Sequence, residues 1–399
     1  MAINFIKLGI KQNVRYLPNV NEISIKEIQT LTNEEDLPIL HVINLKDDKG
    51  FIIISASTLE RPILAYSDKS NFDINTIEDK GGVIDWLYLK YEKINSLIKN
   101  NSTSSIETSN QWSAVYPFPE FGMIDRNGNV IIIPTPQIVN EFDTTETYGK
   151  LMTTEWNQRL NYINSPNVIG YNNDVRFNNC SAGTTPAGCV AVAVGQIVKY
   201  HTNYLTPYIW NMPNIIDNTN YTTTEAKNIG KFLKQIGTYV NMNYECTKSG
   251  AQSEDARNTF ITHYQYTASN LTTANKNTIV NDIKNNKPVY LDGCTDREIK
   301  VYKFLGIKLG EKTTYKNCHA WVAEGYQKIT RTTELDNGYT YSSVISDHIY
   351  MNWGWGGYRN GFFDFDVWEN INGQSFPETN FFYKQNMIYN IKPILQVNL

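Results

Sequence analysis

A cysteine at the start of an apolar segment is the residue of this chain best suited to covalent chemistry. Cys189 stands in PAGCVAVAVGQIVKYH, residues 186–201, whose small apolar residues predict a buried helix. Pro186, Ala187 and Gly188 break the chain just before it, which places Cys189 at or near the helix N-terminus. There the unpaired N–H groups and the helix dipole lower a thiol pKa and can hydrogen-bond an oxyanion. The competing interpretation is a packing residue, because free cysteines are often buried.

A thiolate nucleophile also needs a base, and His319 in NCHAWVAEG is the best candidate. It lies 130 residues after Cys189 and begins a strand pattern that runs to a turn at Asp336-Asn337-Gly338. The other four histidines lack comparable neighbours in the sequence. Taken alone, the pattern around His319 favours a hydrogen-bonded core histidine, so its partners decide the interpretation.

The residues after that turn return as YTYSSVISDHIYMNWGWGG, which is typical of the second strand of a hairpin. If Asn337 and Gly338 form a two-residue turn, Gly356 lies opposite His319, and a bulge would shift this register by a few residues. The hairpin is therefore predicted to bring the NWGWGG stretch beside the imidazole.

Four residues near the predicted nucleophile and base are assigned supporting roles. Asn352 and Trp355 are predicted to orient and shield the imidazole of His319, with the division of these roles left open. Trp353 and Gly188 are predicted to contact the substrate. The competing interpretation of NWGWGG is a tight aromatic turn with no part in catalysis.

Composition excludes several other classes of protein. The 399 residues are 41% hydrophobic and 19% charged, which is ordinary for a globular protein. A net charge of -4 gives no general reason to bind nucleic acid or an anionic membrane, and no apolar run is long enough to span one. Five cysteines without Cys-x-x-Cys and five histidines without His-x-x-x-His allow a zinc site only by long-range assembly. We therefore predict no metal and no organic cofactor.

The sequence patterns indicate two parts of different character. Residues 38–56 and 122–134 each predict a hairpin, and residues 82–100 predict an amphipathic helix. Residues 100–111 have almost no apolar content and are typical of an exposed linker. From about residue 146, helical patterns come first, including 224–240, and strand patterns follow after about 285, which favours the α+β class.

Several stretches closely resemble the streptopain family of secreted bacterial cysteine peptidases, which are papain-like in fold. They are GCVAVAVGQIVKYH, HAWVAEGY and NWGWGGYRNGFF. WNQ, residues 156–158, followed by NYINSPN, resembles the family's upstream Asn-Gln motif, which implies that Gln158 is an oxyanion-hole residue. GFIIISASTLERPILAYSDKSNFD resembles the family's inhibitory propeptide. The chain departs from true papains, where the nucleophile stands in Cys-Gly-Ser-Cys-Trp.

The resemblance and the residue patterns together predict an α+β proenzyme. Residues 1–110 would be an inhibitory propeptide domain, itself α+β, and residues 111–146 a linker and activation segment, with the final cut near 140–150. Residues 147–399 would be the papain-like peptidase domain, a helical subdomain plus an antiparallel β subdomain. Cys189 and His319 would hydrolyse protein or peptide substrates, with the propeptide acting as an intramolecular inhibitor.

The resemblance also implies that the enzyme is secreted or cell-surface. MAINFIKLGIKQNV lacks the pattern of a signal peptide, so a leader is expected to be missing from this chain. Two alternatives stay open. One is another Cys-His acyl-transfer enzyme, such as a transglutaminase-like protein or a cell-wall amidase. The other is an inactive binding protein, against which the intact cysteine, histidine and glutamine argue.

Overall fold

The computed structural model describes residues 25–74, 82–115, 122–124, 130–132, 138–158, 185–201, 224–304, 307–365 and 383–394. Up to β7 the elements are β1 (Ile25–Thr32), β2 (Pro38–Leu45), the 3-10 helix η1 (Lys46–Asp48), β3 (Phe51–Ser55), β4 (Ile63–Ser67), α2 (Val83–Lys99), α3 (Ile106–Val115), β5 (Gly122–Ile124), β6 (Val130–Ile132) and β7 (Ile138–Gly149). We call β1 to α3 the N-terminal domain and the chain from β7 onward the C-terminal domain.

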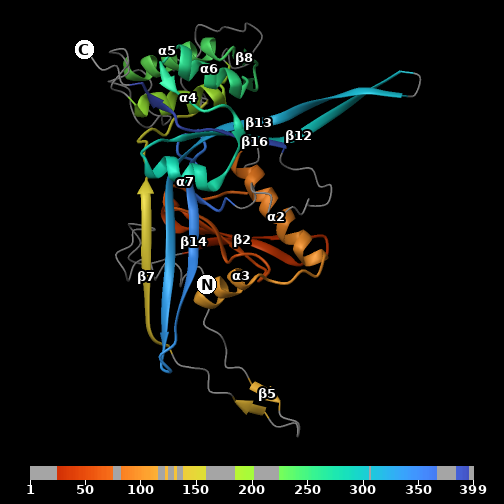
Figure 1. The fold of residues 1–399 in the computed structure, drawn as a ribbon, viewed down its shortest axis with the longest axis vertical. Coiled ribbons are helices and arrows are strands. Elements are labelled where there is room, and N and C mark those ends of the chain that lie inside the picture. Colours follow the sequence, from red (N-terminus) through yellow and green to blue (C-terminus); the bar gives the residue numbers. More distant parts are fainter. Residues whose placement is uncertain are drawn as a thin grey trace.

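The C-terminal domain has its helices before most of its strands. The elements after β7 are α4 (Cys189–Tyr200), α5 (Thr224–Tyr239), β8 (Asn243–Tyr244), β9 (Ser249–Gly250), α6 (Ser253–Thr262), β10 (Tyr266–Thr267), β11 (Thr272–Thr273), α7 (Lys276–Lys284), β12 (Val289–Phe304), β13 (Ile307–Leu335), β14 (Thr340–Asn352), β15 (Gly361–Phe363), β16 (Tyr383–Ile388) and β17 (Lys392–Pro393). Helices α4, α5 and α6 gather at one end of the molecule (Figure 1). The predicted α+β class is confirmed.

One antiparallel sheet runs through both domains. Its strand order is β1-β2-β3-β4-β15-β14-β13-β12-β16-β11, and β7 also pairs with β13. The two domains meet where β4 pairs with β15, at Phe362 opposite Tyr66 and Phe363 opposite Ala65. The N-terminal domain therefore extends the sheet of the C-terminal domain as added strands.

Two helices cover the N-terminal strands, one on each face. β3 and β4 are buried along their whole length, which requires apolar cover on both sides. Trp86 and Ile94 of α2 pack on one face with Phe51 and its neighbours, while Val115 of α3 packs on the other face with Ile52. The hairpin predicted over 38–56 and the helix predicted over 82–100 are both confirmed.

The predicted linker at 100–111 is wrong for its second half. Residues 106–115 form α3, and the Trp112 indole donates to the carbonyl of Glu60 at 2.7 Å. Few apolar residues are enough here because only one side of the short helix is buried. The next predicted element, the 122–134 hairpin, is present as β5 paired with β6, and its Asn127-Gly128 turn lies outside the described residues.

The helix that carries Cys189 forms as predicted and is the centre of the helical end. Every residue of α4 from Val190 to Val198 is buried, and α5 and α6 pack around it. Phe232 and Ile236 of α5 lie on the apolar face expected from its periodicity. The first turn of α4 faces the sheet, because α4 also packs against β13 through Ala320 and Val322.

A long two-stranded arm projects from the C-terminal domain (Figure 1). It is formed by β12 and β13, which stay paired from Val289 opposite Ala323 out to Phe304 opposite Ile307. A disulfide joins Cys294 to Cys318 at the base of this arm, one residue before His319. The disulfide thus ties together the two strands that meet beside the predicted base.

Candidate active site

Cys189 is the first residue of α4, and the geometry of the turn before it requires glycine. Gly188 has φ 89° and ψ 136°, and a Cβ there would lie 2.6 Å from the Met242 sulphur. Cys189 is a free, partly buried thiol. Burial raises its pKa, although the backbone N–H groups of Ala320, Val190 and Cys189 itself act in the opposite direction. The sequence predicted a lowered pKa, and in this state burial outweighs the helix terminus.

His319 is buried on β13 and makes its hydrogen bond to a backbone carbonyl. Its Nε2 lies 2.9 Å from the carbonyl oxygen of Trp353, so this nitrogen carries the proton and donates it. Burial lowers the pKa of His319 to about 4, and the Trp353 carbonyl only partly offsets this. The imidazole is therefore neutral, and because Nε2 holds the proton, Nδ1 keeps the free lone pair that a general base needs.

The hairpin register brings Trp355 to the imidazole. β13 pairs with β14 from Glu334 opposite Thr340 to Val322 opposite Asn352, with two bulges on the way. The turn is a three-residue loop in which Gly338 has φ 79°, so the register differs by one residue from that of a two-residue turn. The Trp355 ring lies 5.1 Å from the His319 ring at an interplanar angle of 6°. Trp355 therefore stacks on His319. Continuing the β13–β14 register beyond the Val322–Asn352 pair also places Trp355 opposite His319.

Asn352 does not contact the imidazole among the described hydrogen bonds. Its side-chain nitrogen donates to the Thr154 carbonyl at 2.8 Å and to Glu324 at 3.2 Å. Its side-chain oxygen accepts from the Gly354 N–H at 3.2 Å. The structure thus places Asn352 under the loop that carries Trp355, on the side of the site that leads to Gln158.

Trp353 and Gly82 cover the remaining side of His319. Trp353 is fully buried, its ring lies 5.1 Å from that of Trp321 at a tilt of 36°, and it packs edge-to-face on Phe363. A Cβ on Gly82 would lie 2.6 Å from His319 Cδ2 and 2.7 Å from Trp353 Cε3. The backbone of Gly82, at the start of α2, therefore lies directly against the imidazole. In this state Trp353, predicted to contact substrate, is covered by the N-terminal domain.

Gln158 is buried close to the start of α4. Its carbonyl accepts from the Ala187 N–H at 2.8 Å, two residues before Cys189. On the other side, Asn157 forms a β-bridge with Trp355, and the Gly356 N–H donates to the Trp156 carbonyl at 3.1 Å. Residues 156–158 therefore lie between the nucleophile's helix and the loop that stacks on the base.

Three contributors were not expected from the sequence. Gln196 and Glu324 are buried polar residues beside Asn352, and Gly82 comes from the N-terminal domain. A signal existed for the first two. Gln196 is the one polar side chain in the buried stretch Val190–Val198, two turns after Cys189, and Glu324 is the acidic residue in the apolar HAWVAEGY. Gly82 carries no such signal, because a close backbone approach cannot be read from a glycine alone.

Among the described residues, no group of three or more His, Cys, Asp or Glu side chains could hold a metal ion. In the same part of the chain, no helix is long and apolar enough to cross a membrane.

Two protein families match the chain, one in the C-terminal domain and one at the N-terminal end. Residues 202–363 match the Peptidase C10 family, and residues 1–93 match the Spi protease inhibitor family. The first range contains His319, Asn352 and Trp355 and begins 13 residues after Cys189. The second contains β1 to β4, Gly82 and most of α2. No curated protein matches the sequence.

Solved structures provide a further comparison. The chain is similar to a fragment of prointerpain A from Prevotella intermedia that carries a cysteine-to-alanine mutation, with 19% identity and a TM-score of 0.53, over 92% of this chain and 99% of that one. Active wild-type interpain A from the same organism matches with 18% identity and a TM-score of 0.39, over 61% of this chain and 94% of that one. The first likeness supports the overall fold.

Proposed function

Because this chain is a cysteine peptidase of the C10 family with a Spi-type inhibitor domain at its N-terminal end, we propose that it is an endopeptidase zymogen. The N-terminal domain is its inhibitory propeptide, and Cys189 and His319 are its catalytic pair. The observation that carries the proposal is the contact between Gly82 and His319. Through this contact the inhibitor domain covers the predicted catalytic base.

The proposed reaction is nucleophilic hydrolysis of a peptide bond. Cys189 attacks the scissile carbonyl, and His319 takes the thiol proton and then gives it to the leaving amine. A water molecule then hydrolyses the thioester, with His319 as its base. The backbone N–H of Cys189 and the side-chain amide of Gln158 hold the oxyanion. The support is spatial, because Ala320, the neighbour of His319, directs its N–H toward the Cys189 sulphur.

In the proenzyme, the hydrogen bond to Trp353 fixes the tautomer of His319, because the proton on Nε2 leaves Nδ1 free to accept the thiol proton. Once that proton has moved, proximity to the thiolate favours the imidazolium. Removal of Gly82 and α2 would uncover the imidazole and would admit water and substrate. We therefore assign latency to the cover that the N-terminal domain places over His319.

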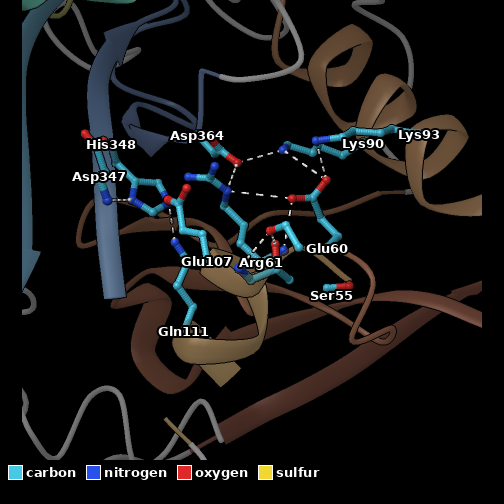
Figure 2. A network of polar contacts seen from close by, with 12 residues as sticks. Ser55, Glu60, Arg61, Lys90, Lys93, Glu107, Gln111, Asp347, His348 and Asp364 are labelled. Atoms are coloured by element: carbon cyan, nitrogen blue, oxygen red, sulfur yellow. Dashed lines mark hydrogen bonds and ion pairs between the residues drawn. The ribbon is translucent and has the colours of Figure 1, made fainter. Parts of the chain in front are cut away.

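A buried cluster of charged side chains stabilises the docked position of the inhibitor domain (Figure 2). Asp364 of the C-terminal domain is fully buried and lies 2.7 Å from Lys90 and 2.9 Å from Arg61, both of the N-terminal domain. Glu60 lies within ion-pair distance of the same two cations and of Lys93. A buried carboxylate needs such partners, and Asp364 finds them in the inhibitor domain, so the docked arrangement is specific.

We place the start of the peptidase unit at β7, somewhat earlier than residue 147. β7 pairs with β13 from Ile138 opposite Leu335 to Gly149 opposite Gly325. Asp143 is held by Arg331 of β13 through two hydrogen bonds of 2.8 and 3.0 Å, with both side chains nearly fully buried. A strand held in this way is expected to stay with the mature enzyme, so the final cut falls before β7 and not near 140–150.

Export from the cell is part of the proposal. The Cys294–Cys318 disulfide supports it, because structural disulfides persist in oxidising compartments. Finding the processed enzyme in the culture medium of the producing cells tests this, and its retention inside them would contradict it. A second acyl-transfer activity is not favoured by any specific observation in the described site.

Substituting Gly82 by alanine is expected to impair latency. The new methyl group would overlap the His319 and Trp353 rings, and φ 64° is unfavourable for alanine. We expect the purified Gly82→Ala proenzyme to process itself at least about tenfold faster than the wild type, since about 1–2 kcal/mol of strain opposes docking. The measurement is a time course of chain size.

The matched control for Gly82→Ala is Gly338→Ala. Gly338 also has a positive φ, 79°, but a Cβ there meets nothing within 4 Å, and it lies at the far end of the β13–β14 hairpin. Backbone strain without the contact at His319 should leave the processing rate unchanged. Equal rates for wild type and Gly82→Ala would remove Gly82 from the inhibitory contact.

Acid is expected to destabilise the folded proenzyme through His348. This residue is buried on β14, and burial lowers its pKa from 6.5 to about 4, with Arg61 and Lys276 lowering it further against Asp364 and Asp347. A histidine with a lowered folded-state pKa stabilises above 6.5, and the stability is lost as the pH falls toward 4. The loss should reach about 3 kcal/mol at pH 4.

Urea unfolding of the proenzyme at pH 4 to 7, in a Cys189→Ala background that prevents self-cleavage, measures this loss. His348→Gln cannot take up a proton, so its stability should fall less over the same range. His201 and His319, whose pKa values are also lowered to about 4, titrate in both proteins and cancel in the comparison. Parallel stability profiles for the two proteins would rule out His348 as the source.

A further inference from the structure

Three buried polar side chains meet beneath the site and remain unused by the reaction described above. Gln196 comes from α4, Glu324 from β13 and Asn352 from the end of β14. None of them exposes more than 2% of its surface. Burying three polar groups in an apolar interior is unfavourable unless each finds hydrogen-bond partners. Their partners therefore indicate what the cluster does.

The partners lie along one short segment of backbone, Met152 to Gln158. Glu324 accepts from the Met152 N–H at 2.6 Å, and Asn352 donates to the Thr154 carbonyl at 2.8 Å. Gln196 accepts from the Trp156 N–H at 3.0 Å. Met152, Thr154 and Trp156 are thus each held by one side chain of the cluster. Gln158 ends the segment, and its carbonyl accepts from the Ala187 N–H.

The three side chains also bind one another. The amides of Gln196 and Asn352 face each other, with each nitrogen 3.3 Å from the other's oxygen. Asn352 donates to Glu324 at 3.2 Å, so both carboxylate oxygens of Glu324 accept an N–H. Two donors facing one carboxyl group favour its ionised form, and they oppose the burial that raises the pKa of Glu324 to about 7.

Each member comes from an element that carries a catalytic group. Gln196 lies two helical turns after Cys189, Glu324 lies five residues after His319, and Asn352 precedes the loop that holds Trp355. The segment that they bind ends at Gln158. The cluster therefore connects the nucleophile, the base and its stacking partner to the proposed oxyanion donor.

We propose that Gln196, Asn352 and Glu324 are positioning residues that hold the Met152–Gln158 segment so that Gln158 faces the oxyanion. This assigns Asn352 to the oxyanion side of the site and leaves the contact with the imidazole to Trp355. The proposal rests on the proposed function, since it needs Gln158 to act as the donor. A misplacement of about 1 Å at a reacting group can cost about 100-fold in rate.

The test uses Gln196→Met, which keeps the length of the side chain but removes the acceptor for the Trp156 N–H. Proenzymes are processed with a trace of active wild type, and a parallel Cys189→Ala reaction corrects for that trace. We expect kcat on a fluorogenic peptide to fall by about 10- to 100-fold with KM changed less than about twofold. In a Gln158→Ala background, Gln196→Met should lower kcat by less than about twofold, because the donor it positions is gone.

Alkylation of Cys189 by iodoacetamide separates positioning from general damage. This reaction forms no oxyanion, so its rate should stay within about twofold of the wild type in Gln196→Met. Glu324→Gln should likewise lower kcat and leave the alkylation rate unchanged. The reason is that the NH2 of a glutamine would face either the N–H of Met152 or the side-chain NH2 of Asn352. Its matched control is Asp282→Asn, another buried carboxylate that accepts a backbone N–H, from Asn390, on a helix without site residues. That variant should lose thermal stability and keep kcat.

The outcomes are distinguishable. The positioning role is supported if wild-type activity depends on Gln158, if the kcat losses of Gln196→Met and Gln158→Ala are non-additive, and if the alkylation rate is unchanged. The positioning role is overturned if activity depends on Gln158 but the two losses are additive, or if the alkylation rate falls as much as kcat does. That result leaves the peptidase assignment intact. A wild-type enzyme that cleaves no peptide overturns the proposed function and the positioning role with it.

Discussion

Cys189→Ala is expected to abolish peptidase activity and self-processing while leaving the fold intact. The substitution removes only a sulphur atom from a partly buried position, so α4 and its packing should persist. Without the thiolate no acyl-enzyme can form, and kcat should fall by more than about 10⁴-fold. Hydrolysis of casein, the size of the chain over time and the thermal unfolding midpoint measure the three parts of this result.

The control for Cys189→Ala is the double variant with His319→Ala. A nucleophile and its base act as one unit, so the double variant should be no less active than either single variant. His319→Ala alone should therefore approach the activity of Cys189→Ala. A Cys189→Ala protein that still trims itself and hydrolyses casein would refute the assignment of the nucleophile.

Gln158→Ala has the next largest expected effect, a fall in kcat of about 10²- to 10³-fold, or about 3–4 kcal/mol. An oxyanion donor strengthens its hydrogen bond mainly in the transition state, so KM should change much less than kcat. Steady-state kinetics of the processed enzyme on a peptide substrate separate the two constants. The position of Gln158, with its carbonyl bonded to Ala187 at the start of α4, motivates the expectation.

Trp112→Phe is a suitable comparison for Gln158→Ala, because Trp112 belongs to the N-terminal domain and leaves with it. Its processed enzyme should have wild-type kinetic constants. If Gln158→Ala raised KM and left kcat unchanged, Gln158 would be a substrate contact, and the oxyanion hole would need another donor.

The elements that carry the site could be predicted because their signals are local. Small apolar residues after Pro186-Ala187-Gly188 specify a buried helix that starts at Cys189. The turn at Gly338 fixes the approximate register that leads to Trp355. In both cases a few neighbouring residues determine the geometry, so the pattern survives in the folded protein.

The roles of polar side chains could not be predicted, because they depend on partners distant in sequence. Asn352 bonds to Thr154, which is 198 residues away, and Glu324 bonds to Met152 at a separation of 172 residues. The hairpin pattern left open whether Asn352 or Trp355 orients His319, because it does not show that Asn352 hydrogen-bonds to Thr154 and Glu324. The pKa of Cys189 was misjudged for a related reason, since burial in the docked state is a long-range property.

The domain arrangement has a similar explanation. The sequence indicates a folded N-terminal unit, but not that β4 would pair with β15 or that Asp364 would be buried by Lys90 and Arg61. Most of β7 falls in the segment that was predicted to be a linker, and the structure shows that most of its residues are exposed. Its partner β13 lies almost 190 residues away, and only that pairing shows that β7 is part of the sheet.

The rate at which iodoacetamide alkylates Cys189, before and after processing, tests the central claim most directly. In the intact chain burial raises the thiol pKa and the N-terminal domain covers His319, so alkylation should be slow. Once the N-terminal domain is removed, His319 can pair with the thiolate, and we expect the rate at pH 6 to rise at least about 100-fold. Peptide mass spectrometry locates the modified residue. Equal rates before and after processing, or inactivation with Cys189 unmodified, would contradict the account.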